Sequence, residues 1–128
     1  MAFKNLRDYL AHLKAENLLH VVEDRISKDT ELVPLVRLQF RGLAEEERKA
    51  FWFKNVTDAR GRDFDASVVL GSLGCSRQVY AAALGVAPDE IGAKWASTHG
   101  KPINPVEVAP GDAPVKQFAY AGETFGEG

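Results

Sequence analysis

The sequence predicts an α/β fold, or an α+β variant of it, in which helices pack on a small sheet and a proline-rich extended segment leads away. Apolar residues at helical spacing alternate with short apolar runs of strand length, which is the order expected of a layered domain. Hydrophobic residues make up 45 % and charged residues 27 % of the 128 residues, an ordinary composition for one core. After Gly100 the composition changes, because four of the six prolines follow it. We therefore expect a domain over residues 1–110 and a connector over residues 111–128.

The first predicted elements are an amphipathic helix and a strand. Asn5 is the expected N-cap of the helix, and Asn17 its expected end. Residues 18–22 follow directly as a short apolar strand. The apolar face of the helix has i, i+3, i+4 and i+7 spacing and consists of Leu6, Tyr9, Leu10 and Leu13.

A second helix is predicted from about Asp29, with Asp29 or Thr30 as its N-cap. Pro34 is compatible with a helix only near the first turn, and Gly42 is a natural stop. The expected buried stripe of this helix is Leu32, Leu35, Val36 and Phe40.

The remaining elements are shorter and are separated by polar or glycine-rich turns. A helix capped by Ser76 and ended by Gly85 is the clearest of them. In chain order we expect a solvated charged run at residues 45–49, strands at 51–56 and 67–70 with a polar turn at 58–65 between them, helices at 76–84 and from Pro88 onward, and a possible short edge strand at 106–108.

Charge and cysteine content exclude several classes of protein. The formal net charge is −2, whereas a nucleic-acid-binding domain or a polybasic membrane anchor leaves a basic footprint. Cys75 is the only cysteine, so no internal disulfide forms and nothing indicates an oxidising compartment. No apolar run approaches the ~20 residues of a spanning helix. We expect a cytoplasmic protein that binds neither nucleic acid nor membrane.

The histidines, Cys75 and a run of glutamates are the candidate metal ligands of the sequence. His12, His20 and His99 do not have ligand spacing to one another, and none forms a zinc pattern with Cys75. Three consecutive carboxylates at Glu45, Glu46 and Glu47 could hold a cation, but such runs more often face water. We therefore predict no metal-binding residue.

The loop of residues 71–77 is the second candidate, since it connects a predicted strand to a predicted helix. Backbone amides at such a helix start can hold an anion, and Arg77 could assist. The sequence matches neither a P-loop nor a dinucleotide fingerprint, so a tight turn capped by Ser76 is the simpler interpretation. Cys75 could be a low-pKa thiol there, although no histidine lies near it in sequence and an unreactive loop cysteine is favoured.

The aromatic run of Phe51, Trp52 and Phe53 is the third candidate, because such side chains can stack on bases or on flavin. Aromatic residues in a strand before a turn are more often core. Taken residue by residue, the sequence predicts no catalytic, cofactor-binding or metal-binding residue.

Short motifs follow one another along the chain in an order that resembles a known family. The set resembles the N-terminal domain of UbiD-type decarboxylases over nearly all of the 128 residues, and the order makes it more specific than any single motif. The motifs are Leu6-Arg7-Asp8-Tyr9-Leu10, Leu18-Leu19-His20-Val21-Val22-Glu23, Ser27-Lys28-Asp29-Thr30-Glu31-Leu32, Phe51-Trp52-Phe53-Lys54-Asn55-Val56, Val69-Leu70-Gly71-Ser72-Leu73-Gly74-Cys75-Ser76-Arg77, Ala81-Ala82-Ala83-Leu84-Gly85-Val86, Pro102-Ile103-Asn104-Pro105-Val106-Glu107-Val108 and Ala113-Pro114-Val115-Lys116.

The resemblance implies a lyase that reversibly decarboxylates aromatic or α,β-unsaturated carboxylic acids. Such enzymes use prenylated FMN with Mn²⁺ and K⁺, and are commonly homo-oligomers. Their Glu-Arg-Glu catalytic set and flavin ligands lie in a later split-barrel domain, and no residue of this sequence matches that motif. The resemblance therefore implies an N-terminal scaffold that packs beside a flavin domain and binds no cofactor itself.

Two other functions stay open at this point. The chain could be a freestanding module that binds a small molecule or flavin through the loop of residues 71–77. It could also be a non-catalytic subunit that docks on a separate decarboxylase chain.

The composition of the C-terminal segment generates a first prediction. Residues from about Gly111 onward have few apolar anchors and several turn formers, so packing cannot offset their ordering entropy. We expect fast amide exchange and early proteolysis over this segment. Slow exchange across residues 113–120 of the monomer, measured by hydrogen–deuterium exchange, would contradict the prediction.

Overall fold

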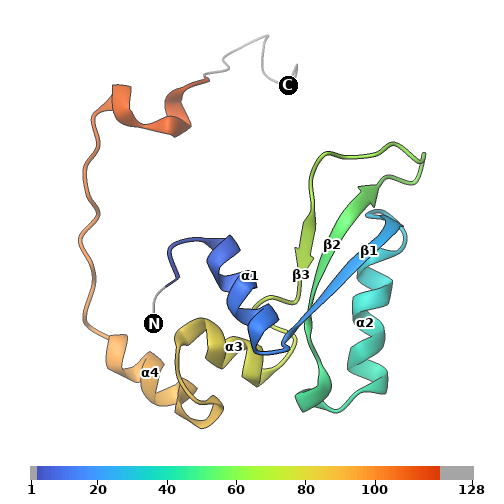
Figure 1. Cartoon of the computed structure of the whole chain (residues 1–128). Coiled ribbons are helices and arrows are strands. Elements are labelled where there is room, and N and C mark those ends of the chain that lie inside the picture. The colour runs from blue at the N-terminus through green and yellow to red at the C-terminus, as the bar shows by residue number, and fades with distance from the viewer. Residues whose placement is uncertain (1–2, 119–128) are drawn as a thin grey trace. The chain divides into compact units, whose positions relative to one another are not determined.

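The structure is a computed structural model that describes residues 3–118 (Figure 1). The chain divides after Thr98 into two compact units. The α/β fold class is confirmed. The first unit contains α1 (Leu6–Ala15), β1 (Leu19–Ser27), α2 (Leu32–Gly42), β2 (Ala50–Thr57), β3 (Val68–Leu70), α3 (Arg77–Leu84) and α4 (Ile91–Thr98), with 3-10 turns η1 (Glu45–Glu47) before β2 and η2 (Pro88–Glu90) before α4.

The sheet is three-stranded and mixed, with β2 in the centre. Strand β1 pairs parallel to β2, so α2 is the crossover between two parallel strands. Strand β3 pairs antiparallel to β2, with Phe51 opposite Leu70 and Phe53 opposite Val68.

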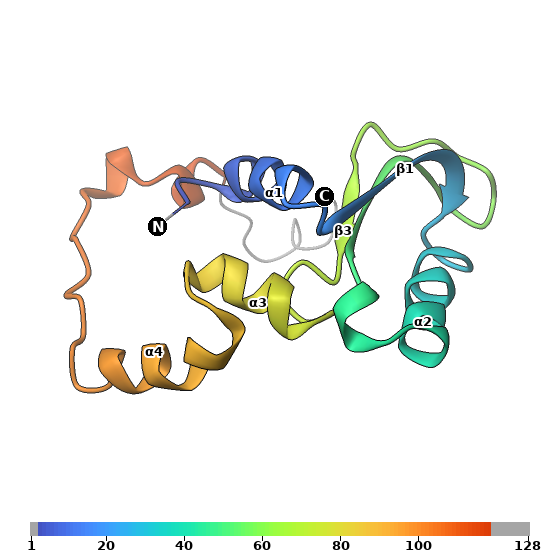
Figure 2. The same ribbon diagram turned by 60° about the horizontal axis from the view of Figure 1, so that its bottom comes forward.

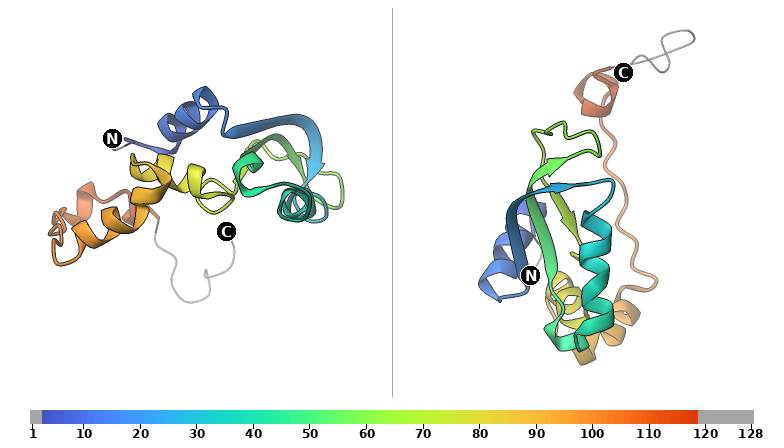
Figure 3. Two further views of the ribbon diagram at one scale, coloured as in Figure 1. Left: turned by 90° about the horizontal axis from the view of Figure 1, so that it is seen from below. Right: turned by 90° about the vertical axis from the view of Figure 1, so that its right-hand side faces the viewer.

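Side chains of β2 alternate between two hydrophobic cores, one on each face of the sheet. Ala50 and Trp52 belong to the core under α1 and α3, whereas Phe51 and Phe53 belong to the core under α2. Figures 1 and 3 show α1 and α3 on one face and α2 on the other. The buried members of the first core are Tyr9, Leu10, Leu13, Leu19, Ala50, Cys75 and Val79. Those of the second are Ile26, Leu32, Val36, Phe53 and Val56.

Helix α1 confirms its predicted ends. The Asn5 side chain accepts a hydrogen bond from the Asp8 amide at 3.0 Å, and Asn17 has the left-handed φ of 57° that ends a helix. Leu6 is an exception to the predicted face, because its side chain is 55 % exposed. Phe3 packs at this end of the core instead, with its ring 5.0 Å from that of Tyr9.

Strand β1 is longer than predicted, since it continues to Ser27 after an irregularity between Val22 and Arg25. The predicted caps of the second helix are wrong, because α2 begins at Leu32 without a side-chain cap. The Asp29 carboxylate instead accepts a hydrogen bond from the Ala59 amide at 2.9 Å. Asp29, which follows β1, is therefore bonded to the loop after the neighbouring strand β2 and does not cap α2.

The buried stripe of α2 is also narrower than predicted. Leu32 and Val36 are buried, but Leu35 and Phe40 are exposed. Gln39 occupies the third buried position, where its side-chain oxygen accepts a hydrogen bond from the Lys49 amide at 2.9 Å. Pro34 lies within the first turn and Gly42 is the last helical residue, as predicted.

Helices α3 and α4 confirm the later predictions. The Ser76 hydroxyl accepts a hydrogen bond from the Val79 amide at 3.3 Å, and Gly85 ends α3 in the left-handed conformation at φ 66°. The helix predicted from Pro88 onward begins as the η2 turn and continues as α4.

The sequence predicts a possible edge strand at residues 106–108 and an extended connector from Gly111 onward. Within residues 99–118 the structure has no strand, so the edge strand at residues 106–108 is wrong. Pro105 precedes it and Pro110 follows it, and prolines lack the N–H that a ladder needs. Two 3-10 turns follow, at Pro110–Asp112 and Pro114–Lys116.

The predicted domain at residues 1–110 and connector at residues 111–128 stay predictions, and residues 119–128 of the connector lie outside the described residues. Over the part of the chain that the structure describes, no helix combines the length and apolar character needed to cross a membrane.

Tyr9 connects α1 to the loop after β3 and to α3. Its hydroxyl lies 2.7 Å from the Ser72 carbonyl oxygen and 2.9 Å from that of Val79, so it can donate to either. Burial, and secondarily the nearby Cys75, raise the pKa of Tyr9 to about 12. The neutral, hydrogen-bonded phenol is therefore favoured in the folded state.

Tyr9→Phe should lower the free energy of unfolding by about 1 kcal/mol at neutral pH, because the one hydroxyl proton that can be donated to the Ser72 or the Val79 carbonyl is lost. The loss should shrink as the pH rises from 10, the ordinary pKa, to about 12, the pKa in the folded protein. In that window the unfolded chain loses the phenol proton first, so wild-type stability falls with pH. Urea unfolding of both proteins from pH 7 to 12 measures this. A difference that does not change with pH would contradict the role of the phenol proton.

Candidate functional site

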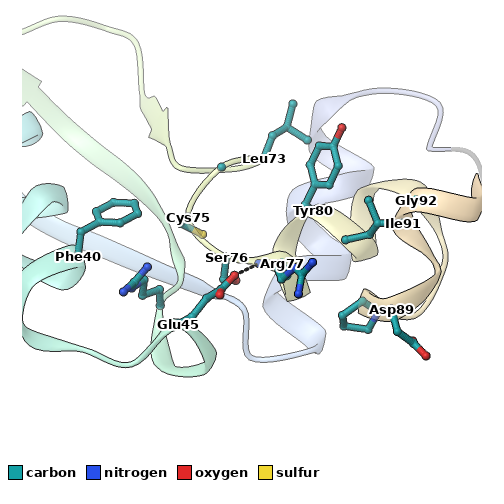
Figure 4. A pocket seen from close by; sticks show the side chains of 13 residues that line it. Phe40, Glu45, Leu73, Cys75, Ser76, Arg77, Tyr80, Asp89, Ile91 and Gly92 are labelled. Carbon is teal, nitrogen blue, oxygen red and sulfur yellow. Dashed lines mark hydrogen bonds between the residues drawn. The ribbon is translucent and has the colours of Figure 1, made fainter. Parts of the chain in front are cut away.

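A cavity of about 680 Å³ lies at the start of α3, beside the loop that the sequence singled out (Figure 4). It brings residues 73–77 of this loop together with the charged run before β2 and with the start of α4. The residues that line it are Phe40, Glu45, Arg48, Leu73, Gly74, Cys75, Ser76, Arg77, Tyr80, Pro88, Asp89, Ile91 and Gly92.

The start of α3 is occupied by one of the chain's own carboxylates. The Arg77 amide donates a hydrogen bond to Glu45 Oε1 at 2.8 Å, drawn as a dashed line in Figure 4. Ser76 satisfies a second amide, that of Val79. A carboxylate is favoured at this position, because the helix dipole and the free N–H groups both attract negative charge. An external anion would have to displace Glu45 to use these amides.

Glu45 reaches α3 because η1 lies against it, as Figure 2 shows. The turn has an internal cap of its own, since Glu47 accepts a hydrogen bond from the Ala44 amide at 3.2 Å. The run predicted to be merely solvated therefore contains two structural carboxylates.

Cys75 does not have the environment of a reactive thiol. Its side chain is 1 % exposed, and burial raises its pKa, so the thiol form is favoured over the thiolate. Gly71 makes this packing possible: it has a φ of 71°, and a Cβ added there would lie 3.1 Å from the Cys75 Cβ. The interpretation of Cys75 as an unreactive loop cysteine fits this geometry.

The basic and aromatic side chains around the cavity are mostly engaged with the chain itself. The Arg48 guanidinium lies 5.1 Å from the Phe40 ring centroid and donates to the Leu43 carbonyl at 3.2 and 3.3 Å. On the opposite side, Trp95 donates to the Tyr80 hydroxyl at 3.0 Å and thereby connects α4 to α3.

The three histidines belong to different segments of the chain. His12 packs beside Phe3 with ring centroids 5.2 Å apart, and His20 lies 5.3 Å from Phe51. His99 belongs to the second unit. Among residues 3–118, no three His, Cys, Asp or Glu side chains gather where they could hold a metal ion.

The aromatic run of β2 serves as core, as the simpler interpretation predicts. Phe53 is fully buried, and its ring stacks on that of Phe51 at 5.7 Å. Trp52 packs on the opposite face, and its indole N–H donates to the Ser67 hydroxyl at 2.9 Å. These rings are therefore committed to packing.

Sequence reasoning missed the residue that matters most at this site. Glu45 and Arg77 lie 32 positions apart, so no local spacing relates them. The sequence does offer one signal, which is the predicted start of α3, because the N–H groups of a helix start attract negative charge. A carboxylate of the chain itself can supply that charge, and here it is the carboxylate of Glu45.

Comparison with known protein families gives a match over most of the chain. Residues 10–98, more than half of the chain, match the family model described as the 3-octaprenyl-4-hydroxybenzoate carboxy-lyase N-terminal domain. The match runs from within α1 to the last residue of α4, so it contains the whole sheet and every residue of the cavity. Neither the curated proteins nor the solved structures include a significant match.

Glu45→Ala should lower the free energy of unfolding by about 0.5–1 kcal/mol, because α3 loses a carboxylate at its positive end. Glu46→Ala is the matched control: Glu46 is an immediate neighbour in the same turn, and none of its side-chain atoms contacts α3 through a hydrogen bond among the described residues. Its substitution should leave the stability almost unchanged.

Inorganic phosphate tests whether Glu45 occupies a position that attracts anions. If the amides of α3 are freed in Glu45→Ala, phosphate should raise the melting temperature of that variant more than that of Glu46→Ala or wild type. Equal responses of all three proteins in thermal unfolding would mean that Glu45 does not occupy an anion-attracting position.

Proposed function

The chain belongs to the family of 3-octaprenyl-4-hydroxybenzoate carboxy-lyase N-terminal domains, and on that premise we propose that it is the scaffold domain of a UbiD-type lyase. The complete enzyme would reversibly decarboxylate aromatic or α,β-unsaturated carboxylic acids. Its catalytic residues would lie outside these 128 residues, in a flavin-binding domain of the same polypeptide or of a separate catalytic subunit.

The observation that carries the scaffold role is the hydrogen bond from the Arg77 amide to Glu45. A flavin phosphate or a substrate carboxylate at the start of α3 would meet a negative charge that is already bonded there. The loop of residues 71–77 is thus built for internal support, which argues against a freestanding anion-binding or flavin-binding module.

The cofactors of the family do not fit the residues described. Prenylated FMN needs donors for its phosphate, and the best-placed amides in the cavity are already engaged by Glu45 and Ser76. Mn²⁺ needs a cluster of oxygen or nitrogen ligands, which residues 3–118 lack. We therefore assign prenylated FMN, Mn²⁺ and K⁺ to the flavin domain.

The remaining parts of the proposal concern the complete enzyme. We place it in the cytoplasm, consistent with a sequence whose single cysteine is a free, buried thiol. We also propose a homo-oligomer, as the family resemblance implies. Its small-molecule partner is an aromatic or unsaturated acid, and neither nucleic acid nor membrane is involved.

The 128-residue chain by itself should bind neither FMN nor prenylated FMN, and should release no carbon dioxide from a panel of aromatic acids. Calorimetric titration and a carbon dioxide assay measure the two properties. The complete lyase, assayed in parallel with prenylated FMN and Mn²⁺, is the positive control. Tight flavin binding or turnover by the chain alone would overturn the scaffold role, and an inactive complete lyase would overturn the enzyme assignment.

A further inference from the structure

Residues 101–108 form an extended segment that presents two nearly fully exposed apolar side chains. Ile103 is 95 % exposed and Val106 is 87 % exposed. None of these residues is in a helix or a strand, and Pro102 and Pro105 favour the polyproline II conformation here (Figure 1). Because that conformation repeats every three residues, Ile103 and Val106 are expected on the same side of the segment, about 9 Å apart. The segment can therefore insert both side chains into one surface.

The first unit contains a groove that can receive these side chains. The cavity beside α3 and a depression of about 420 Å³ between α2 and the loop after β3 share Phe40, Leu73 and Gly74, so they are continuous. Ile91 lines the first hollow and Val33 lines the second, which gives each hollow an apolar wall. Figure 4 shows Phe40 and Ile91 on opposite sides of the cavity. We call the two hollows together the α2–α4 groove.

The charges of the segment match those of the groove. In the segment, Lys101 precedes the two apolar side chains and Glu107 follows them. In the groove, Asp89 lies at the α4 end and Arg37 at the α2 end. Both residues are exposed, and neither forms an ion pair within residues 3–118. A segment that runs from the α4 end to the α2 end would therefore place each of its charges beside an opposite one.

We propose that the chain associates with a second copy of itself by exchange of these segments, each lying in the α2–α4 groove of the other copy. Every copy carries both halves of the contact, so a two-fold pair fills both grooves with the same residues. Proline-rich segments bind grooves with aromatic walls, because their backbone is already extended and loses little entropy on binding. Phe40 and Tyr80 supply such walls here. The inference deepens the proposed homo-oligomer and rests on that part of the proposed function alone.

Sedimentation equilibrium of the 128-residue chain is the first test, and the wild type should form a dimer as its concentration rises. Ile103→Ser/Val106→Ser should raise the dissociation constant of that dimer by about a hundredfold or more, since burial of each side chain contributes about tenfold. Val115→Ser is the matched control, because Val115 is 86 % exposed in the same unit and lies outside the segment. It should change the dissociation constant by less than about twofold.

A mixture of two variants tests the exchange itself. Leu73→Asp places a charge in the groove and leaves the segment intact, whereas Ile103→Asp does the reverse. Each variant alone should be monomeric at a concentration where the wild type is dimeric. Their equimolar mixture should form a heterodimer, weaker than the wild-type dimer, because the segment of the first variant still fits the groove of the second. A mixture no more associated than either variant alone overturns the exchange.

Charge reversal tests the direction of the segment. Glu107→Lys should weaken the dimer by about threefold or more, because the new ammonium group would meet Arg37. Arg37→Glu in the same chain should restore the affinity, since the ion pair is then present with its charges exchanged. A double variant that is as weak as Glu107→Lys overturns the assigned direction.

The outcomes distinguish this inference from the proposed enzyme. A chain that stays monomeric at about 1 mM overturns the exchange and leaves the decarboxylase assignment intact. A dimer that Ile103→Ser/Val106→Ser does not weaken uses another surface, which also overturns the exchange. A monomeric wild type whose double variant binds a synthetic peptide of residues 101–109 would have the segment in its own groove, and the second copy would be wrong.

Discussion

Strand β2 has a hydrogen-bonded neighbour on each edge and helices over each face, and this position constrains the rest of the unit. Ala50 and Phe53 are fully buried on opposite faces. The absence of a large side chain at Ala50 allows α1 and the Cys75 loop to approach the sheet, whereas Phe53 fills the space beneath α2. Successive side chains of a strand point to opposite faces. A shift of one residue in register would therefore move Phe53 to the face under α1 and Ala50 to the face under α2, and both cores would be disrupted.

The cavity beside α3 is a consequence of that arrangement. Strand β3 leaves the sheet at Leu70, and the chain turns at Gly71 so that Cys75 enters the core under α1. Tyr9 then holds the loop from the side of α1, and Glu45 holds the start of α3 from the side of β2. Groups that could have served a ligand are thereby used to join three segments that are distant in sequence. This use of polar groups is what a scaffold requires, since buried or partly buried donors are costly to leave unpaired.

The two faces of the sheet are not covered equally. Helices α1 and α3 share one face, while α2 alone covers the other and keeps large apolar side chains exposed. The charged residues of α2 are both arginines, Arg37 and Arg41. The unit thus has an internally supported site at the start of α3 and exposed apolar side chains on α2.

The sequence by itself determined the features that depend on neighbouring residues. The caps Asn5 and Ser76, the helix ends at Asn17 and Gly85, the strand character of β2 and the α/β fold class all follow from side-chain and backbone preferences within a few positions. The ordered motifs also indicated the family. Only the tertiary structure decided that Asp29 bonds to Ala59 and not to its own helix, that Gln39 is buried in place of Phe40, and that Glu45 caps α3. Each of these contacts joins residues that the fold brings together across 10 to 32 positions, so no local preference along the chain relates the two partners.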